Sequence, residues 1–310
     1  MSNINNPHDK FFRETFSRLE VAQSFIQEIF PVELSSKINL NSLELTNSSF
    51  TDENLIEHLA DLVYQASYKN DNGQDEDVLI TLLFEHKSYT ENYPHFQLLQ
   101  YMLNCWKEEV KQDKQPSVVI PIIIHHGKSD WKKHSIKSYF GTSDIDLLPF
   151  IPAFDYVLFS LNTWEDHQIA NFKNTFLSMA TMLLKHSRDE KERFLALESF
   201  WIAQLKSLDD AHEENFIQSI FLYLENSIDL TTNDLMIIFT KVSTTVTNIA
   251  MTAAERLRIE ERQITTEKTT FEYVKGLWKK GLDANFIADA FALPLQKVEE
   301  IIARIQHSPS

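Results

Sequence analysis

The stretch that decides the fold is Ile80–Ser88, ITLLFEHKS, an apolar run that ends in Glu85-His86-Lys87. Its β-branched and aromatic residues are typical of a β-strand. Because side chains on a strand alternate between its two faces, Glu85 and Lys87 are expected on the same face. The run therefore predicts an acid and a lysine side by side at the end of a strand.

A second strand-like run, Leu59–Tyr68 (LADLVYQASY), precedes the first and is separated from it by the turn-rich stretch Asn70–Asp75. This pattern predicts a β-hairpin. If the turn is centred near Gly73, Asp61 lies directly opposite Glu85 across the hairpin. Two carboxylates and a lysine would then converge at one place.

Two apposed carboxylates repel each other unless a cation lies between them, and oxygen ligands of this kind suit Mg²⁺ or Mn²⁺. Lys87 should stay protonated beside two acids, so we expect it to orient a water molecule and to stabilise charge on a phosphate. The set suits metal-assisted hydrolysis of a phosphodiester. The alternative is a solvated cross-strand charge cluster with no catalytic role.

The surrounding pattern predicts a helix over Asp9–Ile29, a strand over Ser42–Phe50, a helix over Pro94–Asp113 and a buried strand over Val118–Ile124. A strand, helix and strand in succession imply a right-handed parallel crossover. With the antiparallel hairpin, the predicted fold is an α/β protein with an αβββαβ core and a mixed sheet.

This order, with an acid on the second strand and Glu-x-Lys at the end of the third, resembles the PD-(D/E)XK nuclease superfamily. Four segments narrow the resemblance to the Rpn family of recombination-promoting nucleases, also described as transposase-like: PHDKFFRE (7–14), DLVY (61–64), LFEHKS (83–88) and IPIIIHHGK (120–128). The resemblance implies a Mg²⁺- or Mn²⁺-dependent DNA endonuclease. In it Asp61, Glu85 and the His86 carbonyl would bind the metal, and Lys87 would orient water.

Two further pairs are accessory candidates. Gln97 and Tyr101 lie one helical turn apart on the helix after the predicted site, where some nucleases of this superfamily place such a pair near DNA; the alternative is one edge of an amphipathic helix. Asp9 and Glu14 on the first helix could lend an acid to the metal, but Asp9 equally suits helix capping or the helix dipole.

A lysine-rich segment, Gly127–Ser138 (GKSDWKKHSIKS), directly follows the buried strand. It could line a phosphate-facing groove, and the alternative is a solvated loop. Its candidate DNA contacts are Lys128, Trp131, Lys132, Lys133 and Lys137. His125 and His126, just before it, lack a second ligand cluster at zinc spacing.

The formal net charge of −16 argues against binding DNA, because affinity for DNA rests largely on cations that meet phosphates. The charge is unevenly spread, however. Residues 189–235 carry 11 acidic and 3 basic residues, so half of the excess lies outside the nuclease-like region.

Three regions are predicted: residues 1–165 as the nuclease-like domain, 166–262 as a helical region and 263–310 as a small helical tail. Asp155–Leu161 is expected to be the last strand. The polar stretch Glu260–Thr270 suggests a hinge or a frayed helix, and the helix-turn-helix spacing over Asp283–Gln306 suits either DNA or a protein partner.

The single cysteine, Cys105, is expected to be a buried apolar residue in a reducing compartment. No secretory signal or membrane-spanning run is present, so a cytoplasmic protein is expected. Two alternatives to the nuclease remain: a non-catalytic DNA-binding or protein-interaction module that keeps the fold, and a partner-gated nuclease of a defence or toxin-like system. A homo-oligomer or a regulatory partner would bind through the C-terminal helices.

Overall fold

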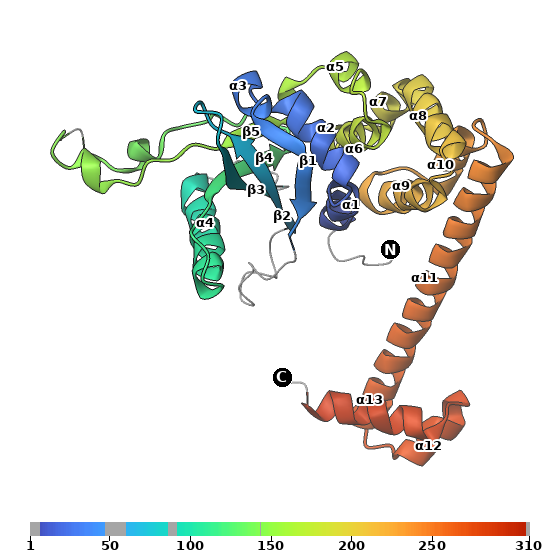
Figure 1. Cartoon of the computed structure of the whole chain (residues 1–310). Helices are drawn as coiled ribbons and strands as arrows, with labels where there is room; N and C mark the ends of the chain where they lie inside the picture. Colours follow the sequence, from blue (N-terminus) through green and yellow to red (C-terminus); the bar gives the residue numbers. More distant parts are fainter. Residues whose placement is uncertain (1–6, 47–59, 86–91, 143, 308–310) are drawn as a thin grey trace. The chain divides into compact units, whose positions relative to one another are not determined.

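The computed structural model describes residues 7–46, 60–85, 92–142 and 144–307 (Figure 1). The chain divides into two compact units, a larger one within Asn5–Ile249 and a smaller one within Ala250–Ser310. The larger unit contains the sheet and the helices packed on it, and the smaller unit is helical.

The larger unit is built on a five-stranded mixed sheet in the order β1-β2-β3-β4-β5. The first three strands pair antiparallel, and β3, β4 and β5 pair parallel. This confirms the predicted αβββαβ order and the parallel crossover through α4 (Pro94–Lys111). The strands are β1 (Ile38–Leu45), β2 (Ala60–Lys69), β3 (Asp75–Glu85), β4 (Val118–His125) and β5 (Val157–Ser160).

The β2–β3 hairpin is closed by a five-residue loop over Asn70–Gln74. The Asn70 side-chain oxygen accepts hydrogen bonds from the backbone N–H groups of Asn72 (3.0 Å) and Gln74 (2.9 Å). Gly73 adopts φ 75°, a left-handed conformation that glycine takes without strain. The loop is therefore centred on Asn72 rather than on Gly73, and this shifts the register of the whole hairpin.

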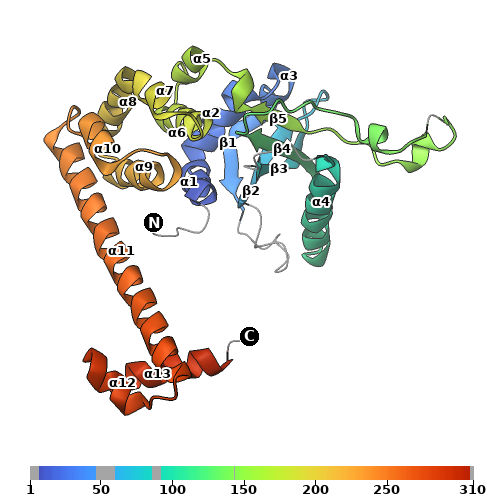
Figure 2. The same cartoon turned by 180° about the vertical axis from the view of Figure 1, so that it is seen from behind.

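The two faces of the sheet are covered by different helices (Figures 1 and 2). On one face, Phe12, Phe16 and Phe25 of the first two helices form a chain of ring contacts that reaches Phe159 of β5. On the other face, Val63 and Leu79 share a buried cluster with Met102 and Cys105 of α4. Val63 and Leu79 thus face α4, and strand alternation assigns the odd positions of β2 and β3 to this face of the sheet. Cys105 is buried, as expected.

The predicted first helix is two helices, α1 (Pro7–Phe16) and α2 (Leu19–Ile29). The break lies at Arg18, whose backbone is extended. Its guanidinium donates to Glu213 (3.2 Å) and lies 4.3 Å from the centroid of the Phe176 ring. These tertiary contacts, invisible to the local apolar pattern, explain the break.

The helical region after β5 packs directly onto α1 and α2. Phe11 of α1 stacks on Tyr223 of α9 (ring centroids 4.4 Å apart), and α6 contacts α1 and α2. The predicted boundary between residues 165 and 166 therefore lies inside one compact unit. Its helices are α5 (Asp166–Ala170), α6 (Thr175–His186), α7 (Lys191–Ala196), α8 (Glu198–Asp210), α9 (Glu214–Ser227) and α10 (Thr232–Phe239).

Short elements complete the larger unit. Helix α3 (Val32–Ser35) leads into β1, and three 3₁₀ turns lie between β4 and α5: η1 (Ile136–Tyr139), η2 (Leu148–Phe150) and η3 (Leu161–Thr163). Strand β1 begins four residues before the predicted start at Ser42, because Ile38 already pairs with Tyr68. Residues 47–50 of that prediction lie outside the described residues.

The smaller unit consists of residues 250–279 of α11 (Thr244–Lys279) with α12 (Ala284–Phe291) and α13 (Leu295–His307). Val274, Ile287, Val298 and Ile302 form its buried core. Of the two alternatives predicted for Glu260–Thr270, the hinge is wrong, since α11 runs through this stretch without a break. Within the described ranges, no helix combines the length and apolarity that crossing a membrane requires.

Candidate active site

The backbone of the two predicted acids, Asp61 and Glu85, lies at the ends of β2 and β3. Asp61 pairs with Leu83 rather than with Glu85, so the predicted direct opposition is wrong. The cause is the loop centred on Asn72, which moves the register by two residues. A two-residue shift preserves the face, and positions 61 and 85 are therefore diagonal neighbours on the α4 face, roughly 7 Å apart in such pairs.

The remaining predicted members of the site are His86 and Lys87. Both lie outside the residues that the structure describes, so the proposed roles of the His86 carbonyl and the Lys87 ammonium stay predictions. The backbone of β3 is described up to Glu85, whose parallel partner on β4 is His125. The carboxyl ends of β3 and β4 thus form the edge at which the candidate site lies.

His125 at this edge is a packed residue. Its side chain is fully buried, its Nδ1 lies 3.1 Å from the Ser160 hydroxyl, and its ring meets that of Trp131 at 5.1 Å. Burial, helped by the positive charge of Arg188, lowers the pKa of His125 to about 4. His125 is therefore neutral at neutral pH. Across the described ranges, no cluster of three or more His, Cys, Asp or Glu side chains that could hold a metal ion occurs.

The first-helix candidates have different surroundings. Burial raises the pKa of Asp9 to about 6, with an opposing effect of Arg13. Asp9 stands in the first turn of α1, where it also suits the helix dipole. Glu14 accepts a 2.5 Å hydrogen bond from Ser219 of α9. Glu14 thus contributes to the contact between α1 and α9.

The Gln97–Tyr101 pair lies on α4, as predicted, but its members differ in exposure. Tyr101 is buried in a cluster with Leu98, Ile123 and Trp131. Gln97 is half-buried. Tyr101 therefore acts mainly as a core residue of the α4 face.

The lysine-rich segment contributes differently from the expectation. Trp131 is only 7% exposed, and its indole donates to the Tyr156 hydroxyl (3.3 Å), so it is not offered to DNA. Lys133 donates to the Tyr156 carbonyl (2.6 Å) and pairs with Asp155. Lys132 and Lys137 are exposed, and these two remain the better candidates for phosphate contacts.

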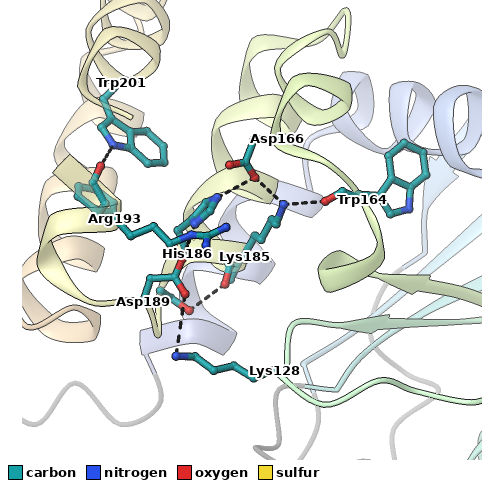
Figure 3. A network of polar contacts seen from close by, with 11 residues as sticks. Lys128, Trp164, Asp166, Lys185, His186, Asp189, Arg193 and Trp201 are labelled. Atoms are coloured by element: carbon teal, nitrogen blue, oxygen red, sulfur yellow. Dashed lines mark hydrogen bonds and ion pairs between the residues drawn. The ribbon is translucent and has the colours of Figure 1, made fainter. Parts of the chain in front are cut away.

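Lys128 joins a polar network that ties the end of β4 to the helical region (Figure 3). Its ammonium lies 3.9 Å from Asp189. The buried imidazole of His186 lies between Asp189 (2.6 Å from Nδ1) and Asp166 (2.9 Å from Nε2). Burial raises the Asp166 pKa, but hydrogen bonds from Lys185 and His186 outweigh burial and hold that pKa below its usual value. The network is thus an anchor for the helices.

Sequence reasoning missed two groups near this edge. His8 lies 3.0 Å from the Tyr223 hydroxyl, and its ring is 5.1 Å from that of His126. Tyr93, Phe96 and Tyr139 form an aromatic cluster at the start of α4. The cluster left a signal in the sequence, since Tyr93-Pro94-His95-Phe96 places two aromatic residues beside a helix-starting proline.

The fold and the placement of positions 61 and 85 define a mixed α/β protein with acids on adjacent strands at one sheet edge. A family model described as "Putative transposase, YhgA-like" matches residues 6–215. Because this match covers more than half of the chain, the protein belongs to that family.

Several curated proteins resemble the chain at low identity. Recombination-promoting nuclease RpnC of Escherichia coli (strain K12) is 29% identical over 125 residues, which are 40% of each chain. RpnA of the same strain is 24% identical over 259 residues, 83% of this chain and 85% of RpnA. The inactive recombination-promoting nuclease-like protein RpnE is 23% identical over 190 residues, 61% of each chain. No solved structure matches the chain.

Proposed function

We propose that this protein is a Mg²⁺- or Mn²⁺-dependent DNA endonuclease. One observation carries the proposal: the hairpin register assigns positions 61 and 85 to one face at the carboxyl end of β3. A scaffold has no need of two carboxylates there, whereas a divalent ion requires them. The names of the related nucleases support DNA as the substrate.

In this proposal each residue has a distinct role. The carboxylates of Asp61 and Glu85, with the His86 carbonyl, would hold the ion. When bound, the ion would supply a Lewis acid that polarises the scissile phosphate and lowers the pKa of water. The Lys87 ammonium would orient the attacking water and stabilise negative charge that develops on the phosphate oxygens. Hydrolysis would form a bond between the water oxygen and phosphorus, break one P–O ester bond, and transfer a proton of that water to the departing oxygen.

One relative favours a second candidate function. RpnE is named as inactive, so a nuclease-like chain of this kind can lack activity. The present chain has an aspartate, a glutamate and a lysine at the three proposed positions, Asp61, Glu85 and Lys87, which favours an active nuclease. In this alternative, a regulatory partner or a second copy of the chain would bind through the C-terminal helices. The single, buried Cys105 fits action in the reducing cytoplasm.

Nicking of supercoiled plasmid tests the proposal. Purified wild type, Glu85→Gln and Lys87→Ala are compared in Mg²⁺, Mn²⁺ and EDTA. Asp75→Asn is the matched control, because Asp75 lies at the opposite end of the same strand. We expect metal-dependent nicking by wild type and by the control, and a loss of about 100-fold or more in the other two variants.

Two results would count against the proposal. Equal nicking by all four proteins would place the activity elsewhere or in a contaminant. If none of them nicks DNA, even in Mn²⁺, the partner-gated or non-catalytic reading would replace the proposal.

A further inference from the structure

Three aromatic side chains form a cluster at the start of α4. The rings of Tyr93 and Phe96 stack with an interplanar angle of 16° and centroids 5.7 Å apart. The Tyr139 ring stands nearly perpendicular to both, at 5.0 and 5.5 Å. The Tyr139 hydroxyl lies 2.6 Å from Nδ1 of His95, a buried residue that also packs on Tyr156. The cluster is thus fixed to the core from below.

The outer rings of this cluster are open to solvent. Tyr93 is 51% exposed and Phe96 is 49% exposed. Large aromatic side chains usually bury most of their surface, so neighbouring exposed rings on a fixed base are informative. Tyr139 contacts both exposed rings and is itself held by His95, so the two rings are fixed in place.

The cluster lies at the same sheet edge as the candidate active site. Leu98 near the start of α4 shares a cluster with Ile123 near the end of β4, while Trp106 further along donates to Ser117 at the start of β4. Helix α4 therefore runs antiparallel to the parallel strands β3 and β4, and its first residues lie at the carboxyl ends of these two strands. Glu85 is the last residue of β3 at this edge. Strand β5 lies two strand spacings from β3, because β4 is between them, and this separation is roughly 10 Å.

The charge around the cluster suits a nucleic acid strand. Lys137 lies two residues before Tyr139, and Lys132 lies in the same segment; both are exposed. Lys133 pairs with Asp155, so its charge is partly compensated. Exposed aromatic rings beside lysines are the combination by which proteins bind single strands: the bases stack and the phosphates meet cations.

We propose that Tyr93 and Phe96 form a stacking site for an unpaired nucleobase next to the cleavage site. The inference rests on the proposed nuclease function and specifies the substrate as DNA with a single-stranded or unpaired segment near the cut. A paired base keeps its faces covered by its neighbours, so a duplex has no face to offer these rings. The site therefore selects unpaired over paired DNA.

Binding without cleavage tests the site. The full-length Glu85→Gln protein in EDTA is titrated with a single-stranded oligonucleotide that contains 2-aminopurine, and with the same strand in a duplex. We expect quenching of the fluorescence on binding the single strand, because stacking quenches this base. Phe96→Ala should weaken single-strand binding about fivefold or more and leave duplex binding unchanged. Phe96→Trp should retain binding.

Leu103→Ala, an exposed apolar residue on the same helix, is the matched control and should change neither affinity. Single-strand affinity that is unchanged in both Phe96→Ala and the Tyr93→Ala/Phe96→Ala double variant would overturn the stacking site alone. So would an equal loss for single strand and duplex. Failure of every variant to bind either probe would overturn the nuclease function together with the site.

Discussion

At the residue scale, His125 makes the stability of the larger unit depend on pH. Burial lowers its pKa to about 4 from the ordinary histidine value of 6.5. As pH falls, the unfolded chain takes up a proton at His125 before the folded chain does. Its contribution to stability is therefore fully present above about pH 6.5 and is lost as pH falls toward 4.

The expected loss is about 2 kcal/mol between pH 7.5 and pH 5. Urea unfolding at both values, in EDTA, measures it. His125→Asn should reduce the pH dependence by that amount, because its side chain carries no titrating proton. His134→Asn replaces an exposed histidine of the following segment and serves as the control. Identical pH dependence in wild type and His125→Asn would refute the assignment.

For some single residues, the exposure expected from the sequence differs from the exposure in the structure. Trp131 among four lysines looks like a nucleic-acid contact, but the apolar neighbours that bury it come from α4 and β4. Tyr93 caps the start of α4 and Phe96 lies in its first turn, and nothing in the sequence marks their side chains as exposed. Exposure depends on tertiary contacts such as that of Tyr139 with both rings, and short-range patterns do not contain them.

At the scale of elements, we expect opposite effects on stability from replacing two glycines near the end of α11 with alanine. Gly276 lies inside the helix, and a Cβ there would meet no atom within 4 Å. Gly281 follows the helix with φ +84°, which L-residues rarely adopt. Gly276→Ala should stabilise the smaller unit by about 0.5–1 kcal/mol, and Gly281→Ala should destabilise it by a similar amount or more.

Thermal unfolding followed by circular dichroism measures both effects, with wild type as reference. Because the two substitutions add the same methyl group, each is the control for the other. Stabilisation by Gly281→Ala, or destabilisation by Gly276→Ala, would contradict the backbone conformations assigned to these positions.

The helices and strands were largely predictable from the sequence, but the hairpin register and the course of the chain through Glu260–Thr270 were not. Apolar alternation located both hairpin strands, and the β-branched run Val118–Ile124 matched β4 closely. The hairpin register was missed because several residues of Asn70–Gln74 favour turns, and the hydrogen bonds of the Asn70 side chain decide among them. The polar composition of Glu260–Thr270 suggested a hinge, yet most of its residues are good helix formers.

At the scale of the whole molecule, the sheet and the helices over residues 166–249 depend on each other. Phe11 of α1 stacks against both Phe216 and Tyr223 of α9. These contacts join residues about two hundred positions apart, and local patterns could not foresee them. The sequence-based boundary at residue 165 consequently cuts through a shared core.

Truncated chains distinguish a domain that ends at residue 165 from one compact unit that extends to residue 249. We expect a chain of residues 1–249 to fold and to nick plasmid, because the larger unit lies within Asn5–Ile249. A chain of residues 1–165 should aggregate, since it exposes the aromatic face of α1. Size-exclusion chromatography and circular dichroism check both. A monomeric 1–165 fragment with a cooperative thermal transition would contradict the claim that the sheet and the helices over residues 166–249 fold as one unit.

The central claim is that Asp61 and Glu85 together bind one divalent ion at the end of the hairpin. Electron paramagnetic resonance of Mn²⁺ titrated into wild type, Asp61→Asn, Glu85→Gln and the control Asp75→Asn tests it most directly, because it requires no DNA. We expect one bound Mn²⁺ per chain in wild type and control, and a loss of at least about tenfold in affinity in each of the other two variants. Binding of equal affinity in all four proteins would contradict it.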